Sequence, residues 1–230
     1  MKLSKYAALV KKGGYCIVAH VEGDGVWLGT SAAIYRAAEL PDAEGEEQIR
    51  AMLDISEKAW EKVYLKEVWV ESVRDIFGMD LSPYVKGEQD AEKLRTAIAP
   101  NGLWSSVVRC KQDDELLFYN DGLLSPLQEE LKDGDYIKYT VRIRKDGSRF
   151  LVVHDGLDVL AAVLPRLIIN EEFLGDLAEF QALCTEQFYR EKNRVRVDAY
   201  IDRPAEAETA EEAEDEAEQI GMEDAAEDEE

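Results

Sequence analysis

Residues 151–165 read LVVHDGLDVLAAVLP, and residues 27–41 read WLGTSAAIYRAAELP. When the second stretch is laid on the first without a gap, Ala-Ala falls on Ala-Ala and Leu-Pro falls on Leu-Pro. Weaker matches extend this alignment over residues 27–56 and 151–180. Because a proline pushes the preceding residue out of the helical region, each Leu-Pro pair is expected to end a helix.

The segment before each of these stretches is expected to form a β-hairpin. Residues 15–29 and residues 136–153 each hold two apolar runs on either side of an Asp-Gly turn, which favours a hairpin. Thr30 or Ser31 in the first copy and Asp155 in the second then stand where a helix would begin. Their side-chain oxygens can accept hydrogen bonds from its first free N–H groups, so a capped helix is expected after each hairpin.

These capped helices would cover residues 31–40 and 157–164, and a second helix is expected after each of them. The apolar periodicity places it over residues 45–55 in the first copy and over residues 171–189, capped by Asn170, in the second. The predicted fold class is therefore α+β, built from two related hairpin-plus-helices units that arose by internal duplication. The alternative is chance similarity between two α+β stretches.

Composition divides the chain further. A segment rich in proline and glycine separates the two units and is typical of a connector. The expected parts are an N-terminal ββαα-type unit plus a strand (1–73), the connector (74–101), a related C-terminal unit (102–203) and an acidic tail (204–230). The tail has too few apolar residues to fold alone, so it is expected to be disordered or partly helical.

The charge is strongly negative and unevenly distributed. The 230 residues include 50 acidic and 27 basic side chains, a formal net charge of −23. Residues 204–230 contain 14 of the acids and no Lys or Arg, which leaves a net charge of −9 on residues 1–203. This balance disfavours a bare nucleic-acid binder, because such proteins usually neutralise phosphates with excess Lys and Arg. The tail is a solubilising end, a mimic of nucleic acid, or a segment that offers a short motif to a partner.

Two small basic clusters are the candidate nucleic-acid contacts on this acidic chain. They comprise Arg142, Arg144, Lys145 and Arg149 around the tip of the second hairpin, and Arg190, Lys192, Arg194 and Arg196 after the last long helix. Alternate residues of a strand share a face, so either cluster can present several cations to phosphate. The alternatives are a solvated surface paired with neighbouring acids, or a docking site for the acidic tail.

Catalytic signals are weak. His154 beside Asp155 resembles a proton relay, and Asp113-Asp114-Glu115 resembles a cation site, but a helix-capping Asp and a hairpin turn explain both. Gly-rich phosphate loops, zinc-protease motifs and Cys-x-x-Cys pairs are absent from the sequence. The chain is therefore expected not to be an enzyme and to use no cofactor or metal.

The sequence is expected to belong to a cytoplasmic protein. Cys16, Cys110 and Cys184 are odd in number and far apart, which is typical of free thiols in a reducing compartment. The first twelve residues lack the apolar core of a signal peptide, and no apolar run approaches the roughly 20 residues that span a bilayer. No membrane partner is expected.

Four short runs carry a resemblance to a known family: WLGTSAAIY at 27–35, DISEK at 54–58, LSPL at 124–127 and EEF at 171–173. They resemble an uncharacterised protein family of Firmicute phages and integrated mobile elements, often found among DNA-replication genes. The resemblance covers most of residues 10–185. It implies a setting in phage or mobile-element DNA metabolism, and it carries over no activity and no catalytic residue.

These observations predict a non-catalytic accessory protein that acts by binding other proteins, with DNA replication as its setting and a replication or defence protein as its partner. One version is a sliding-clamp-like factor, since such clamps are duplicated α+β proteins that are acidic overall. The helices expected at residues 31–40 and 171–183 are not basic, which argues against that version. The alternatives are an acidic nucleic-acid mimic with an anti-defence or regulatory role, or an enzyme that uses His154 or Asp113–Glu115. Homo-oligomers are compatible with each of them.

Overall fold

The computed structural model describes residues 1–37, 40, 43–98 and 103–201. The chain divides into two units, Met1–Ile169 and Asn170–Glu230. A ten-stranded sheet with its covering helices makes up the first unit, and the helix α5, Glu171–Ile201, is the described part of the second. Residues 204–230, expected to form the acidic tail, lie outside the described residues.

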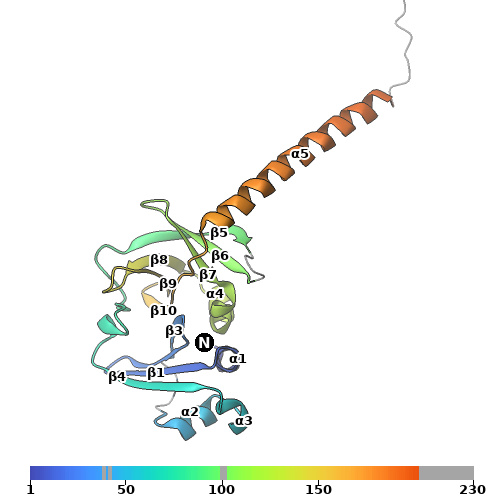
Figure 1. Cartoon of the computed structure of the whole chain (residues 1–230). Coiled ribbons are helices and arrows are strands. Elements are labelled where there is room, and N and C mark those ends of the chain that lie inside the picture. The colour runs from blue at the N-terminus through green and yellow to red at the C-terminus, as the bar shows by residue number, and fades with distance from the viewer. Residues whose placement is uncertain (38–39, 41–42, 99–102, 202–230) are drawn as a thin grey trace, which may run out of the picture. The chain divides into compact units, whose positions relative to one another are not determined.

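The sheet consists of strands numbered in chain order, most of which are labelled in Figure 1. They are β1 Tyr15–Val21, β2 Gly25–Gly29, β3 Ala33–Arg36, β4 Tyr64–Val70, β5 Gln89–Ile98, β6 Ser105–Cys110, β7 Leu116–Asn120, β8 Ile137–Ile143, β9 Arg149–Asp155 and β10 Asp158–Val163. Their order in the sheet is β4-β1-β2-β3-β10-β9-β8-β5-β6-β7. The β1–β4 pair is parallel and the other described neighbours are antiparallel.

Both faces of the sheet are covered. The helical elements of the first unit are α1 Leu3–Gly13, α2 Glu46–Met52, α3 Glu57–Trp60, the 3-10 helices η1 Val73–Asp75 and η3 Asp121–Leu127, and α4 Gln128–Asp133. Side chains of α1, α2, α3 and η3 join one buried apolar cluster with one face of the strands. Ile76, Met79 and Leu81 join a second cluster with the opposite face. Strands β1, β2, β3, β9 and β10 are therefore buried on two sides.

The expected α+β class and several expected elements are confirmed. The two Asp-Gly hairpins are β1–β2 and β8–β9. Helix α2 lies within the range expected for a second helix, and Asn170 caps α5, because its Oδ1 accepts a hydrogen bond from the N–H of Phe173 at 2.8 Å. Helix α5 continues beyond the expected end at residue 189, to Ile201.

The capped helices expected at residues 31–40 and 157–164 were wrong, because the structure has strands β3 and β10 there. Along β3, Ala33 and Tyr35 pack in one apolar cluster and Ile34 packs in the other. Apolar residues on both faces remove the alternation that identifies a half-buried strand, so the sequence pattern fits a helix equally well. The Oγ1 atom of Thr30 accepts a hydrogen bond from the N–H of Ala33 at 3.1 Å, but this turn leads into a strand, not into a helix.

The helix expected at residues 157–164 is replaced by a strand for a related reason. Asp155 is the last residue of β9, and Gly156, with a φ of 58°, turns the chain directly into β10. A positive φ is easily adopted by glycine, so this residue permits a tight connection between the two strands. The expected hairpin-plus-helices unit was therefore wrong. In the structure, three strands follow a helix.

This order of elements occurs twice in the first unit. The chain runs α1-β1-β2-β3 between Leu3 and Arg36, and α4-β8-β9-β10 between Gln128 and Val163. Strands β3 and β10 pair with each other, with Ala33 opposite Val163 and Tyr35 opposite Ala161. One sheet thus passes without interruption from the first set of strands to the second. Among the described residues, no helix has the length and apolar character needed to cross a bilayer.

Candidate functional site

The basic cluster at the second hairpin contains one buried arginine. Arg142 is 2% exposed, and its Nε donates a hydrogen bond to Glu88 at 2.7 Å. Its Nη1 donates to the backbone oxygens of Asp80 and Ser82, both at 2.8 Å. The guanidinium therefore ties β8 to the segment before β5, and it faces protein where the sequence analysis considered phosphate.

Two further members of this cluster also have protein partners. Arg144 donates to the backbone oxygen of Phe77 at 2.9 Å and forms an ion pair with Asp146 at 3.1 Å. Lys145 pairs with Asp75, and this contact holds the pKa of the Asp75 carboxyl below its usual value. The described cations at the hairpin tip thus have acidic or backbone partners within the protein.

Arg149 brings together the basic cluster and the acidic run considered as a cation site. Its Nη2 lies 2.6 Å from Asp113 and its Nη1 lies 3.0 Å from Glu115. The hydrogen bond from Arg149 is the main reason why the pKa of Asp113 falls to about 2. These carboxylates are occupied by a guanidinium, and no group of three or more His, Cys, Asp or Glu side chains suited to a metal ion occurs within the described residues.

The second basic cluster lies inside α5, where the sequence analysis placed it beyond a helix. Arg190 pairs with Glu186 one turn earlier on the same helix. Lys192 and Arg194 are exposed, and the side chain of Arg196 lies outside the described residues. These cations therefore belong to the C-terminal half of one long helix.

His154 is buried in the sheet, where it does not form a proton relay with Asp155. It is 3% exposed, and its Nε2 lies 2.9 Å from the hydroxyl of Thr140. Burial, reinforced by the positive charge of Arg142, lowers the pKa of His154 to about 4. The imidazole is consequently neutral near pH 7, and its contacts are those of a core residue.

The other histidine borders a hollow of about 710 Å³ beside β1 and β4. The Nε2 of His20 lies 2.9 Å from the carboxylate of Glu67, and its ring stacks on Trp69 with 5.0 Å between the ring centroids. Glu22, Glu44 and Glu71 line the same hollow, and the described lining holds no Ser, Thr or Cys. An acidic rim next to an exposed indole suits a cationic group better than nucleophilic chemistry.

The sequence analysis missed the basic surface of α1. Tyr6, Ala7 and Val10 face the core, whereas Lys5, Lys11 and Lys12 are exposed. Within the described ranges none of these lysines pairs with a carboxylate, and α1 itself contains no acid. The spacing of its apolar residues and Gly14, which ends the helix at a φ of 66°, were the available signals.

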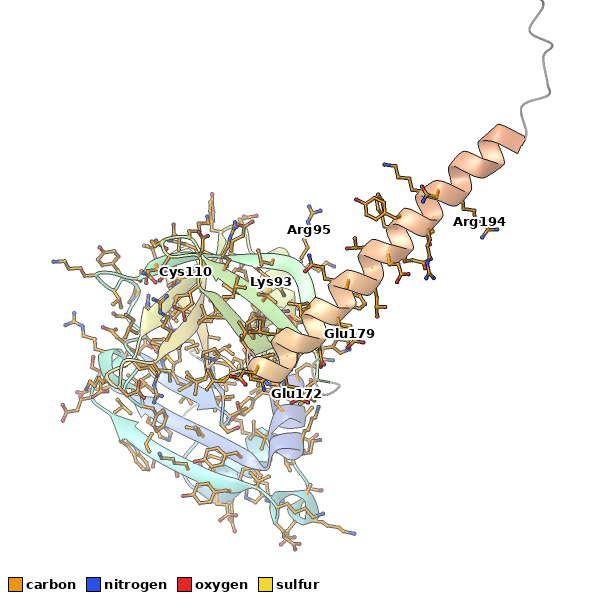
Figure 2. The ribbon with its side chains drawn as sticks, turned by 45° about the horizontal axis from the view of Figure 1, so that its top comes forward. Lys93, Arg95, Cys110, Glu172, Glu179 and Arg194 are labelled. Atoms are coloured by element: carbon orange, nitrogen blue, oxygen red, sulfur yellow. The ribbon has the colours of Figure 1, made fainter. Side chains whose placement is uncertain are left out.

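Neighbouring elements add two lysines to this side of the unit. Helix α1 packs against η3, and the backbone N–H of Lys2 donates to Pro126 at 2.7 Å. Lys93 and Lys132 line a hollow of about 390 Å³ beside η3 and α4. Lys93 forms an ion pair with Asp121 at 3.0 Å, and Figure 2 shows it with Arg95 on β5.

Comparison with known proteins assigns no family to this arrangement. The chain matches no protein-family model, no curated protein and no solved structure. The features that bear on function are therefore the lysines of α1 and the repeated order of elements.

Proposed function

We propose that this chain is a non-catalytic, cytoplasmic accessory protein of phage or mobile-element DNA metabolism, which acts by binding in the manner of a sliding clamp. The observation that carries the proposal is the row of unpaired lysines on α1, a helix packed on a sheet that runs through two sets of α-β-β-β elements. This surface would contact the phosphate backbone of duplex DNA. Protein partners would bind elsewhere on the chain.

The repeated order of elements supports an internal duplication. The ungapped alignment of residues 27–56 with residues 151–180 places β2 on β9 and β3 on β10. Each set is preceded by a helix, and the two sets meet at the β3–β10 pair. Sliding clamps are likewise duplicated α+β proteins, acidic overall, with basic residues on the helices that face DNA.

Two expected helices without basic residues counted against a clamp. Residues 171–183 do form part of α5 and carry acids without a base, but the other helix is absent. Residues 31–40, expected to form a non-basic helix, contain strand β3, and the helix that precedes the first three strands is α1. Lys5 and Lys12 are two turns apart on α1, or about 11 Å along its axis. Their ammonium groups stand on an otherwise acidic body, so DNA contact would be confined to this surface.

Replacing Lys5, Lys11 and Lys12 together by glutamine is expected to weaken binding to a short duplex by about tenfold or more at low salt. Each phosphate contact contributes about 0.9 to the slope of log K against log salt concentration, so the slope should fall by about 3. Fluorescence anisotropy with labelled duplexes of two unrelated sequences measures both quantities. The two sequences should behave alike, because phosphate contacts read no bases.

The matched control is the triple substitution of Lys58, Lys86 and Lys111 by glutamine. These three residues are exposed on the same unit, so the change in net charge is identical. The control should retain the affinity and the salt slope of the wild type. Equal losses in the two triple variants would overturn the proposal, as would a wild-type chain that binds no duplex at low salt.

A further inference from the structure

Helix α5 carries a row of exposed apolar side chains. Leu177, Phe180, Leu183 and Phe188 are 49%, 65%, 56% and 60% exposed, respectively. Phe173 begins the row, and intervals of three or four residues lead from it through Leu177 and Phe180 to Cys184 and Phe188. Since residues at these intervals share one side of a helix, α5 presents a continuous apolar stripe.

A second observation concerns how charge is distributed along the same helix. Between residues 171 and 189 there are five acidic residues and no basic one, whereas residues 190–194 hold three basic residues and one acid. Figure 2 shows Glu172 and Glu179 in the N-terminal half of α5 and Arg194 toward its C-terminal end. The stripe itself is therefore flanked by negative charge, and a basic segment follows its C-terminal end.

We propose that α5 pairs with α5 of a second copy of this chain, in antiparallel orientation, through this apolar stripe. Antiparallel pairing sets the acidic half of each helix beside the basic half of the other. Parallel pairing would set acid beside acid over most of the stripe and is disfavoured by like-charge repulsion. Charge complementarity thus selects both the occupant and its orientation.

The spacing of individual charges fits this arrangement. Asp176 and Arg190 are two heptads apart, so they lie on the same flank of the stripe. A twofold axis midway between them, at Leu183, brings Asp176 of each copy next to Arg190 of the other. The axis also brings the two Leu183 side chains together, which buries an apolar group that is exposed in one copy.

Pairing also explains how the helix is maintained. Thirty-one residues make a helix about 46 Å long, and most helical stability in proteins comes from packing of an apolar face. The described part of α5 contributes the half-exposed side chains of Leu177, Phe180 and Phe188 to that face, with Leu183 on its flank. A second copy supplies the same side chains in return.

The first test is the mass in solution of the full chain, measured by light scattering after size exclusion. The wild type should elute at twice the chain mass of 26.0 kDa. The variant Leu177→Glu/Phe180→Glu should fall to a single chain, a twofold change. Ala182→Glu is the matched control, because this exposed alanine, five residues from Leu177, lies on the side of α5 away from the stripe, and it should stay dimeric.

The second test fixes the orientation in a Cys184→Ser background, which leaves only the buried Cys16 and Cys110. Asp176→Cys and Arg190→Cys chains are prepared separately, mixed, and treated with a short bismaleimide. If the pairing is antiparallel, the mixture should give a covalent dimer made of one Asp176→Cys chain and one Arg190→Cys chain. Either variant treated alone should give no covalent dimer.

Three results would overturn the proposal: a wild-type chain that is monomeric at about 100 µM, cross-linking of each variant to itself, or a dimer that survives Leu177→Glu/Phe180→Glu. Thermal unfolding of that variant should match the wild type, because the substitutions lie outside the ten-stranded sheet. The inference is independent of the lysines on α1. A variant that becomes monomeric but still binds DNA, or one that stays dimeric but loses DNA binding, therefore separates the two proposals.

Discussion

Replacing Arg142 by methionine is expected to lower the free energy of unfolding by about 3–5 kcal/mol. The substitution removes the cation that pairs with Glu88, a carboxylate whose side chain is only 13% exposed. It also removes the donor for the backbone oxygens of Asp80 and Ser82. A buried charge and two carbonyl groups would then be left without their present partner. Urea unfolding followed by tryptophan fluorescence measures the loss.

Two further variants show whether the loss of stability comes from the uncompensated charge of Glu88. Lys145→Met removes a cation from the same hairpin, but its partner Asp75 is half exposed, so the loss should be far smaller than that of Arg142→Met. Adding Glu88→Gln to Arg142→Met should recover part of the stability, since the uncompensated charge is removed. If Arg142→Met unfolds within 1 kcal/mol of the wild type, the guanidinium is not the structural tie described above.

The stability of the fold should decrease by about 3 kcal/mol as the pH falls from 6.5 to 4 because of His154. In the unfolded chain this imidazole has a pKa of 6.5, whereas burial lowers its pKa to about 4 in the folded chain. Between these values the unfolded state binds a proton that the folded state does not. The contribution is therefore fully present above pH 6.5 and is lost as the pH falls through 4.

Denaturation curves recorded at intervals between pH 4 and 7.5 test this dependence. His154→Gln lacks the titrating group, so its free energy of unfolding should fall less steeply over this range, although the variant starts from a lower value. Val152→Ala serves as the control, because it destabilises the same strand without removing a titrating group, and it should keep the wild-type slope. Parallel profiles for the wild type and His154→Gln would contradict the assignment.

The sequence was sufficient for elements with strong local signals. Asp-Gly turns between apolar runs predicted both hairpins, and Asn170 predicted the start of α5. It was insufficient for β3 and β10, since strands buried on both faces lack the alternation that separates strand from helix. Their identity depends on a partner strand more than a hundred residues away, which no local pattern contains.

The candidate site was less predictable than the fold. Arg142 and Arg149 stand out in the sequence as exposed cations, but tertiary contacts with Glu88 and Asp113 make them structural. Lys5 and Lys12 were not among the predicted site residues, because the first residues were interpreted only with respect to a signal peptide. Their significance depends on the helix lying on the sheet with its apolar side inward, a consequence of tertiary packing.

The β3–β10 pair has a consequence for the order in which the nascent chain can fold. Strand β3 leaves the ribosome early, but its second neighbour is synthesised only after residues 37–157. Until then β3 is an edge strand, with one row of backbone N–H and C=O groups unpaired by the sheet. The N-terminal half therefore cannot complete its native hydrogen bonding during synthesis, and closure of the sheet is a late step set by contacts distant in the chain.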